Sequence, residues 1–122
     1  MQLANKVAVV TGASGDLGKK IIQKFSEEGA SIYALVRDIK NNSFNDYTQK
    51  LSIRFKNKIK IIHLDLEKEE TIKESFEIIK SENNHIDILI NNAGILENSL
   101  FQMTTKKILK KIFDVNFFSQ FF

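Results

Sequence analysis

The stretch from Lys6 to Gly18, with the sequence KVAVVTGASGDLG, limits the fold of this chain more than any other. Val7 to Val10 are apolar and mostly β-branched, which is typical of a strand buried on both faces. Three glycines follow at regular spacing, at Gly12, Gly15 and Gly18, and a helical pattern begins among them. The stretch therefore predicts a buried strand, a tight glycine-rich turn and a helix.

A turn of this kind suits a phosphate group. Glycine permits positive φ and leaves no Cβ between the backbone and a ligand. The free N–H groups and the positive dipole end of the following helix favour an anion. We therefore expect a dinucleotide pyrophosphate here, although a tight strand-to-helix turn without any ligand would explain the same glycines.

Apolar runs and helical patterns alternate along the rest of the chain. We expect strands at residues 7–10, 31–36, 58–64 and 87–90, and helices at 17–28, 49–55, 68–82 and from about residue 104 onward. Leu17, Ile21, Ile22 and Phe25 form the apolar stripe of the first helix. Residues 41–48 are polar and predict a loop. The order indicates a doubly wound α/β fold with a parallel sheet of strand order 3-2-1-4 and right-handed crossovers.

Length and composition exclude several classes of protein. The 122 residues are enough for one domain, and no linker divides them. The net charge of +3 comes almost wholly from lysines spread over predicted helices, which argues against a nucleic-acid reader. There is no cysteine, hence no disulfide or thiolate metal site, and His63 and His85 stand alone. No apolar run is long enough for a membrane span and no signal pattern precedes the first strand, so we expect a cytoplasmic protein.

Polar or glycine-rich residues follow all four predicted strands. They are Gly12 to Gly18, Arg37-Asp38, Asp65-Leu66 and Asn91 to Gly94. Ligands of doubly wound sheets bind beyond the carboxyl ends of the strands, so these turns would line one site.

Arg37 and Asp65 are candidates for contacts with an adenosine. An acid at the end of the second strand bonds a ribose 2′-hydroxyl, whereas an arginine accepts a 2′-phosphate, so Arg37 favours NADP over NAD. Neighbouring Asp38 weakens the positive field, and an ordinary surface arginine is the alternative. Asp65 would accept a hydrogen bond from the adenine amino group, or else cap the next helix.

Four motifs together resemble the short-chain dehydrogenase/reductase family. They are TGASGDLG at Thr11 to Gly18, Asp65-Leu66, NNAG at Asn91 to Gly94, and Val115-Asn116. The resemblance covers the whole chain, and HIDILINNAGILEN, from His85 to Asn98, is similar to bacterial 3-oxoacyl-acyl-carrier-protein reductases. It implies a Rossmann-like domain over residues 1–122, an oxidoreductase that transfers hydride between nicotinamide and a carbonyl or alcohol carbon of a small molecule, and dimers or tetramers of the full-length form.

The resemblance also assigns residues to the cofactor. It implies that the pyrophosphate lies on Gly12, Ala13, Ser14, Gly15, Asp16, Leu17 and Gly18. Arg37 would meet the 2′-phosphate, Asp65 and Leu66 the adenine, and Asn92, Ala93 and Gly94 the ribose. Asn116 matches the residue that holds a relay water during catalysis; a plain helical asparagine is the alternative.

Two features depart from the family pattern. Asp16 stands where simpler reductases have a glycine, and we expect it to point away from the phosphates and cap the helix. The family's catalytic Ser and Tyr-x-x-x-Lys have no match, since the residues four positions after Tyr33 and Tyr47 are Arg37 and Leu51.

We therefore expect the chain to be the first half of a longer reductase, truncated after the fourth strand and the start of the following helix. That last helix is apolar nearly all round and expects burial on more than one side. The alternative is a catalytically inactive nucleotide-binding module. A phosphoacceptor receiver domain is a third reading, and it fails because the acids it needs after the first strand are replaced by Thr11-Gly12.

Overall fold

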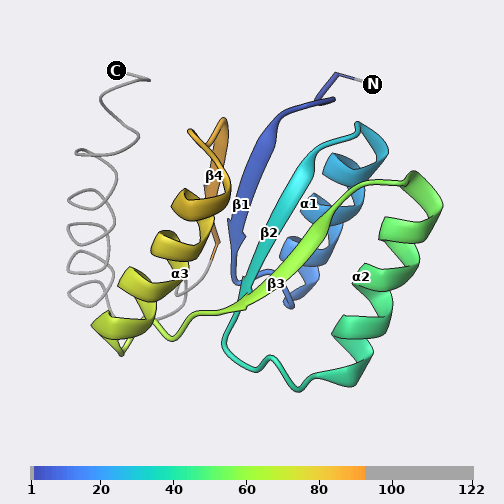
Figure 1. Cartoon of the computed structure of the whole chain (residues 1–122). Coiled ribbons are helices and arrows are strands. Elements are labelled where there is room, and N and C mark those ends of the chain that lie inside the picture. Colours follow the sequence, from blue (N-terminus) through green and yellow to red (C-terminus); the bar gives the residue numbers. More distant parts are fainter. Residues whose placement is uncertain (1, 93–122) are drawn as a thin grey trace.

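The computed structural model describes residues 2–92, which form a parallel sheet flanked by helices (Figure 1). In chain order the elements are β1 (Val7–Thr11), α1 (Asp16–Glu27), β2 (Ser31–Val36), α2 (Asn42–Phe55), β3 (Ile59–His63), α3 (Glu69–Glu82) and β4 (Ile88–Asn91). This alternation confirms the predicted α/β fold. The predicted last helix lies outside the described residues.

The strands of the described part pair in parallel in the order β3-β2-β1-β4, as predicted. β1 lies inside the sheet: the chain moves from it to β2 and β3 on one side and returns to β4 on the other. The strand order thus reverses between β1 and β4. In doubly wound sheets the crevice beyond the carboxyl ends of such a strand pair is where ligands bind.

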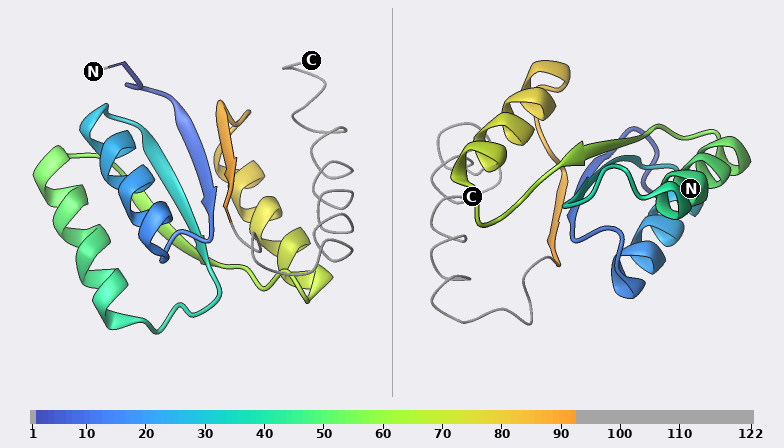
Figure 2. Two further views of the ribbon diagram at one scale, coloured as in Figure 1. Left: turned by 180° about the vertical axis from the view of Figure 1, so that it is seen from behind. Right: turned by 90° about the horizontal axis from the view of Figure 1, so that it is seen from below.

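Helices cover both faces of the sheet (Figure 2). α1 and α2 pack on one face and α3 on the other, and the side chains of β2 alternate between them. Tyr33 and Leu35 face α3, whereas Ile32, Ala34 and Val36 face α1 and α2. Since both faces are covered, the strands are apolar at almost every position, as the first strand's sequence predicted.

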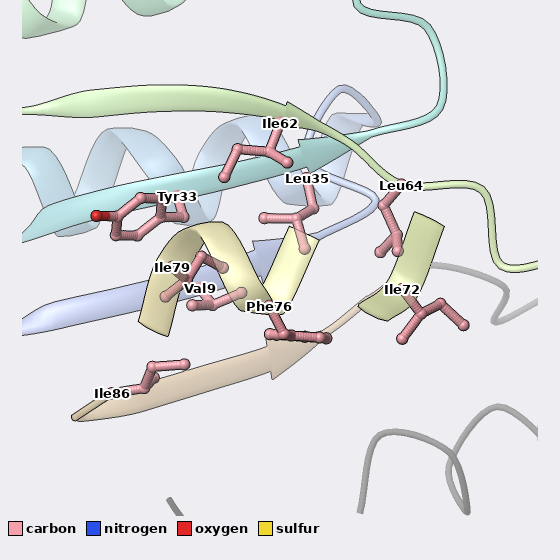
Figure 3. Close-up of a cluster of buried hydrophobic side chains, with 9 residues drawn as sticks. All are labelled: Val9, Tyr33, Leu35, Ile62, Leu64, Ile72, Phe76, Ile79 and Ile86. Carbon is pink, nitrogen blue, oxygen red and sulfur yellow. The ribbon is translucent and has the colours of Figure 1, made fainter. Parts of the chain in front are cut away.

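One of the two hydrophobic cores lies beneath α3 (Figure 3). Side chains of β1, β2 and β3 meet Ile72, Phe76 and Ile79 of the helix, and all three helix residues are at most 1% exposed. Burying one such side chain stabilises the fold by about 1.5–3 kcal/mol. Because α3 is anchored along its length, it fixes where the turns at both of its ends lie.

The prediction of a loop at residues 41–48 was wrong. α2 begins at Asn42, and the Asn41 side chain caps it by accepting a hydrogen bond from the Phe44 N–H at 3.1 Å. Phe44, Thr48 and Leu51 are buried on one side of this helix. The cap and the helical spacing of these three residues outweigh the low helix propensity of the polar residues between them.

None of the helices within residues 2–92 is both long and apolar enough to cross a bilayer.

Candidate nucleotide-binding site

The turn between β1 and α1 requires glycine at two positions, for different reasons. Gly12 has a φ of 61°, a left-handed conformation that strains other residues. Gly18 lies against the turn itself, where a Cβ would approach the Gly12 oxygen to 2.5 Å and the Ala13 oxygen to 2.7 Å. Glycine at position 18 therefore lets α1 pack directly onto the backbone of the turn.

Gly15 is not required by the fold. Its φ of −75° suits any residue, and a Cβ there would meet nothing nearer than the Gly12 oxygen at 3.6 Å. Gly15 is exposed and is the N-cap residue of α1, and no side chain caps this end of the helix. The first N–H groups of a helix lack partners within the helix, so an external anion fits here.

Asp16 does not cap α1, contrary to the prediction. Gly15 occupies the N-cap position, and Asp16 is the first helical residue, exposed to solvent. A capping side chain belongs to the N-cap residue, from which it reaches the second or third N–H of the helix. Asp16 comes one position too late, although its charge still interacts favourably with the helix dipole.

Three other predicted residues of this turn have distinct environments. Ala13 is fully buried, and its N–H donates to the Leu35 carbonyl at 3.3 Å, which ties the turn to β2. Ser14 is half-buried. Leu17 is 56% exposed and so lies outside the apolar stripe that was expected to include it. An uncovered leucine side chain thus lies beside the turn.

A hydrogen-bond network joins the ends of β1 and β4. The buried Thr11 hydroxyl accepts from the Asn92 N–H at 3.0 Å and lies 3.1 Å from the Asn91 side-chain oxygen. The Asn92 side-chain amide donates to the Gly12 carbonyl at 3.2 Å. The sequence placed Thr11 and Asn91 in the motifs at the strand ends but assigned no role to either side chain. Their only signal was that both are polar residues at the last position of an apolar strand.

Arg37 follows β2 and lies close to two acidic residues of the next strand end. Its Nε lies 3.9 Å from a carboxylate oxygen of Asp65, and its Nη2 lies 3.9 Å from one of Glu67. The Arg37 side chain is 72% exposed. The adjacent Asp38 directs a carboxylate oxygen to the Lys40 N–H, at 2.9 Å. The predicted cation is present, and Glu67 is an acidic neighbour that the sequence did not reveal.

Asp65 does not cap α3. The N-cap residue of that helix is Lys68, and no side chain caps it. The Asp65 carboxylate instead accepts from the Glu67 N–H at 3.0 Å, and the Thr71 hydroxyl bonds the Asp65 backbone. Asp65 is buried, and Leu66 packs against the core beneath α3. The loop after β3 therefore holds Asp65 in one position.

Neither tyrosine lies at the carboxyl ends of the strands. The Tyr33 hydroxyl donates to Glu82 at the far end of α3, and Tyr47 lies on α2 with its hydroxyl bonded to the Lys19 carbonyl. Burial is the main factor that raises the pKa of both hydroxyls above 10.0, and Glu82 raises the pKa of Tyr33 further. A tyrosine that donates and accepts a proton near neutral pH needs the opposite shift.

The two histidines are both exposed and lie apart. His63 ends β3, and His85 places its Nε2 3.1 Å from a carboxylate oxygen of Asp87. Among the described residues no group of His, Cys, Asp or Glu side chains could hold a metal ion. Three predicted site residues, Ala93, Gly94 and Asn116, lie outside the described part of the chain.

Comparison with known proteins identifies relatives over nearly the whole sequence. The family model described as short chain dehydrogenase matches residues 6–122. A 3-oxoacyl-acyl-carrier-protein reductase of Buchnera aphidicola is 32% identical over 100% of this chain and 48% of its own length. A farnesol dehydrogenase of Aedes aegypti is 31% identical over 93% of this chain and 46% of its own length.

The fold has close matches among solved structures. L-sorbose reductase of Gluconobacter frateurii, in complex with NADPH and L-sorbose, superposes with a TM-score of 0.76. It is 26% identical and covers 91% of this chain, which corresponds to 47% of the reductase. This chain spans about half the length of the relatives that it matches.

Proposed function

The chain belongs to the short-chain dehydrogenase family, and from this we propose that it supplies the cofactor-binding part of an NAD(P)-dependent oxidoreductase. The reaction is hydride transfer between the nicotinamide and a carbonyl or alcohol carbon of a small molecule. Within this family we propose a reductase similar to the 3-oxoacyl-acyl-carrier-protein reductases, which are among the relatives that match.

One observation carries the proposal: the N-terminus of α1 is exposed and lacks a side-chain cap, and it begins at a glycine that the fold does not need. A glycine at a position where the protein itself leaves room for a Cβ suits the close approach of a ligand to the backbone. The partial positive charge of the helix end then favours a pyrophosphate.

The other strand ends would hold the rest of the cofactor. We assign Asp65 and Leu66 to the adenine, Arg37 to the 2′-phosphate, and Asn92, Ala93 and Gly94 to the ribose. When bound, the cofactor supplies or accepts the hydride. The residues of this chain bind and orient it. The Thr11 hydroxyl holds Asn92 in place by accepting a hydrogen bond from its N–H.

NADP is the preferred cofactor in this proposal, because Arg37 can pair with a phosphate and NAD has none at that position. The L-sorbose reductase complex with NADPH supports this choice for a similar protein. The acidic neighbours of Arg37 weaken the preference, so NAD stays the second candidate.

Catalysis needs groups beyond those of residues 2–92. We assign Asn116 to the position of a relay water, as the family resemblance implies. The general acid and the substrate-orienting Ser have no counterpart in this sequence. A small-molecule substrate, a cytoplasmic location and a dimeric or tetrameric full-length form belong to the same proposal.

A catalytically inactive nucleotide-binding module is the second candidate function. It is favoured by the environments of Tyr33 and Tyr47, whose hydroxyls bond Glu82 and Lys19 away from the strand ends. Both candidates require the cofactor to bind. They differ in whether the protein isolated from its source oxidises NADPH in the presence of a carbonyl substrate.

Variants of Gly15 test the proposed site directly. Gly15→Asp introduces a carboxylate where the pyrophosphate would lie, and Gly15→Ala is the matched control because a Cβ has room there. Isothermal titration should give NADPH binding to the wild type and to Gly15→Ala, and at least a tenfold loss in Gly15→Asp without a change in thermal unfolding. Equal NADPH affinity of both variants would overturn the proposed site.

A further inference from the structure

Glu67 lies in the turn after β3, close to Arg37. Neither the sequence pattern nor the family resemblance gave it a role. Its carboxylate lies 3.9 Å from the Arg37 guanidinium and is 65% exposed. Asp65 lies at the same distance from another nitrogen of that guanidinium, Nε, but is only 11% exposed. Arg37 is therefore close to one buried carboxylate, which the loop fixes, and to one carboxylate that is exposed to solvent.

Both ion pairs are loose. Charge-assisted hydrogen bonds between arginine and carboxylate are about 2.7–2.9 Å long, whereas both N···O distances here are 3.9 Å. The guanidinium is attracted to the two acids without its N–H donors being saturated by them. A third anion that reaches Arg37 can therefore form the shorter, stronger bonds.

The local charge opposes such an anion. Arg37 contributes one positive charge, and Asp65 and Glu67 together contribute two negative charges. Asp65 is fixed because its carboxylate also accepts a hydrogen bond from the Glu67 N–H. Glu67 takes part in this loop through its backbone N–H, so its side chain can be changed without loss of that hydrogen bond.

We propose that Glu67 is a specificity-determining residue that competes with a 2′-phosphate for Arg37 and so limits the preference for NADP over NAD. The Glu67 carboxylate repels the phosphate and draws the guanidinium toward the loop after β3. Both effects act on NADP and leave NAD, which has a 2′-hydroxyl, almost unaffected.

Removal of the charge should therefore raise NADP affinity selectively. Glu67→Gln should lower the Kd of NADP+ by about three- to tenfold, the size expected for one exposed charge a few ångströms from the phosphate, and change the Kd of NAD+ less than about twofold. Titration calorimetry at low ionic strength measures both constants, and 0.5 M NaCl should reduce the gain because exposed charges are screened.

Two further variants separate this role from a general charge effect. Glu77→Gln makes the same charge change on the exposed surface of α3, two turns into the helix, and should leave the ratio of the two Kd values unchanged. In an Arg37→Gln background, Glu67→Gln should gain markedly less NADP+ affinity than in the wild type, because the competition for Arg37 is gone.

The inference fails if Glu67→Gln changes neither Kd, if it changes both equally, or if Glu77→Gln gives the same gain. Since the inference rests on the proposed function, wild-type binding is the reference: a chain that binds neither NAD+ nor NADP+ refutes the proposed function, and the role of Glu67 with it. A chain that binds both cofactors but shows no selective gain refutes only the role of Glu67.

Discussion

Gly15 and Gly18 belong to the same turn, yet the structure constrains them differently. An added Cβ collides with the backbone of Gly12 and Ala13 at position 18 and finds room at position 15. We expect Gly18→Ala to lower the free energy of unfolding by about 1–3 kcal/mol and Gly15→Ala to change it by less than about 0.5 kcal/mol. Urea unfolding followed by circular dichroism measures both, and equal stability of the two variants would contradict the packing of α1 on the turn.

Glu82 makes the stability of the fold depend on acidic pH. Lys60 and the Tyr33 hydroxyl, both hydrogen-bonded to its carboxylate, lower the pKa of Glu82 below 4.5. A carboxylate with a lowered pKa stabilises the folded state above its unfolded pKa, and this contribution is lost as pH falls through the folded pKa.

We therefore expect Glu82→Gln to lose stability near neutral pH and to show a flatter decline than the wild type as pH falls below 4.5. Thermal unfolding from pH 3 to pH 7 measures this difference. Glu77→Gln, an exposed carboxylate on the same helix, is the control. An unchanged pH profile in Glu82→Gln would show that the network around Glu82 contributes nothing.

The start of α2 depends on a single cap. The Asn41 side chain accepts the Phe44 N–H, whereas Asn42 is exposed in the first turn of the same helix. Asn41→Ala should cost about 0.5–2 kcal/mol of stability, and Asn42→Ala should be close to neutral. Chemical denaturation measures the free energy of unfolding of both variants. An Asn41→Ala variant as stable as the wild type would mean that packing of Phe44 alone starts the helix.

The contact between β1 and β4 predicts a further effect on stability. Thr11→Val keeps the shape of the side chain but leaves the Asn92 N–H without its acceptor, at a cost of about 1–3 kcal/mol. Thr11→Ser keeps the hydroxyl and should lose less. Amide hydrogen exchange at Asn92 should be faster in the valine variant and near normal in the serine variant; equal rates in both would contradict the role of the hydroxyl.

The sequence allowed the elements to be placed where apolar residues decide the structure. The strands, α1 and α3 were found within one or two residues because burial on two faces or along one stripe leaves a periodic pattern. The first turns of α2 were not predicted, because their sequence is mostly polar. The helix there depends on the Asn41 cap and on the helical spacing of Phe44, Thr48 and Leu51, which composition does not reveal. Asp16 was misjudged because one position decides whether a carboxylate is the cap or the first helical residue.

At the scale of the whole molecule, the strand order was predictable because alternating strands and helices leave few allowed topologies. It correctly brought Gly12, Arg37, Asp65 and Asn92 to one edge of the sheet. The side-chain partners at that edge were not predictable, since Arg37 with Glu67 and Thr11 with Asn92 are tertiary pairs with no signature in sequence spacing. The fold followed from local pattern, and the details of the site required the assembled sheet.

The central claim is that a dinucleotide binds along this edge of the sheet, with its pyrophosphate at the N-terminus of α1. Titration of the ¹⁵N-labelled chain with NADPH, followed by amide chemical shifts, tests it residue by residue. We predict the largest shifts at Gly12 to Gly18, Arg37, Asp65 and Asn92, and almost none at Lys56 and Asn83 at the opposite end of the sheet. Shifts confined to that opposite end, or no shifts in a well-dispersed spectrum, would contradict the account.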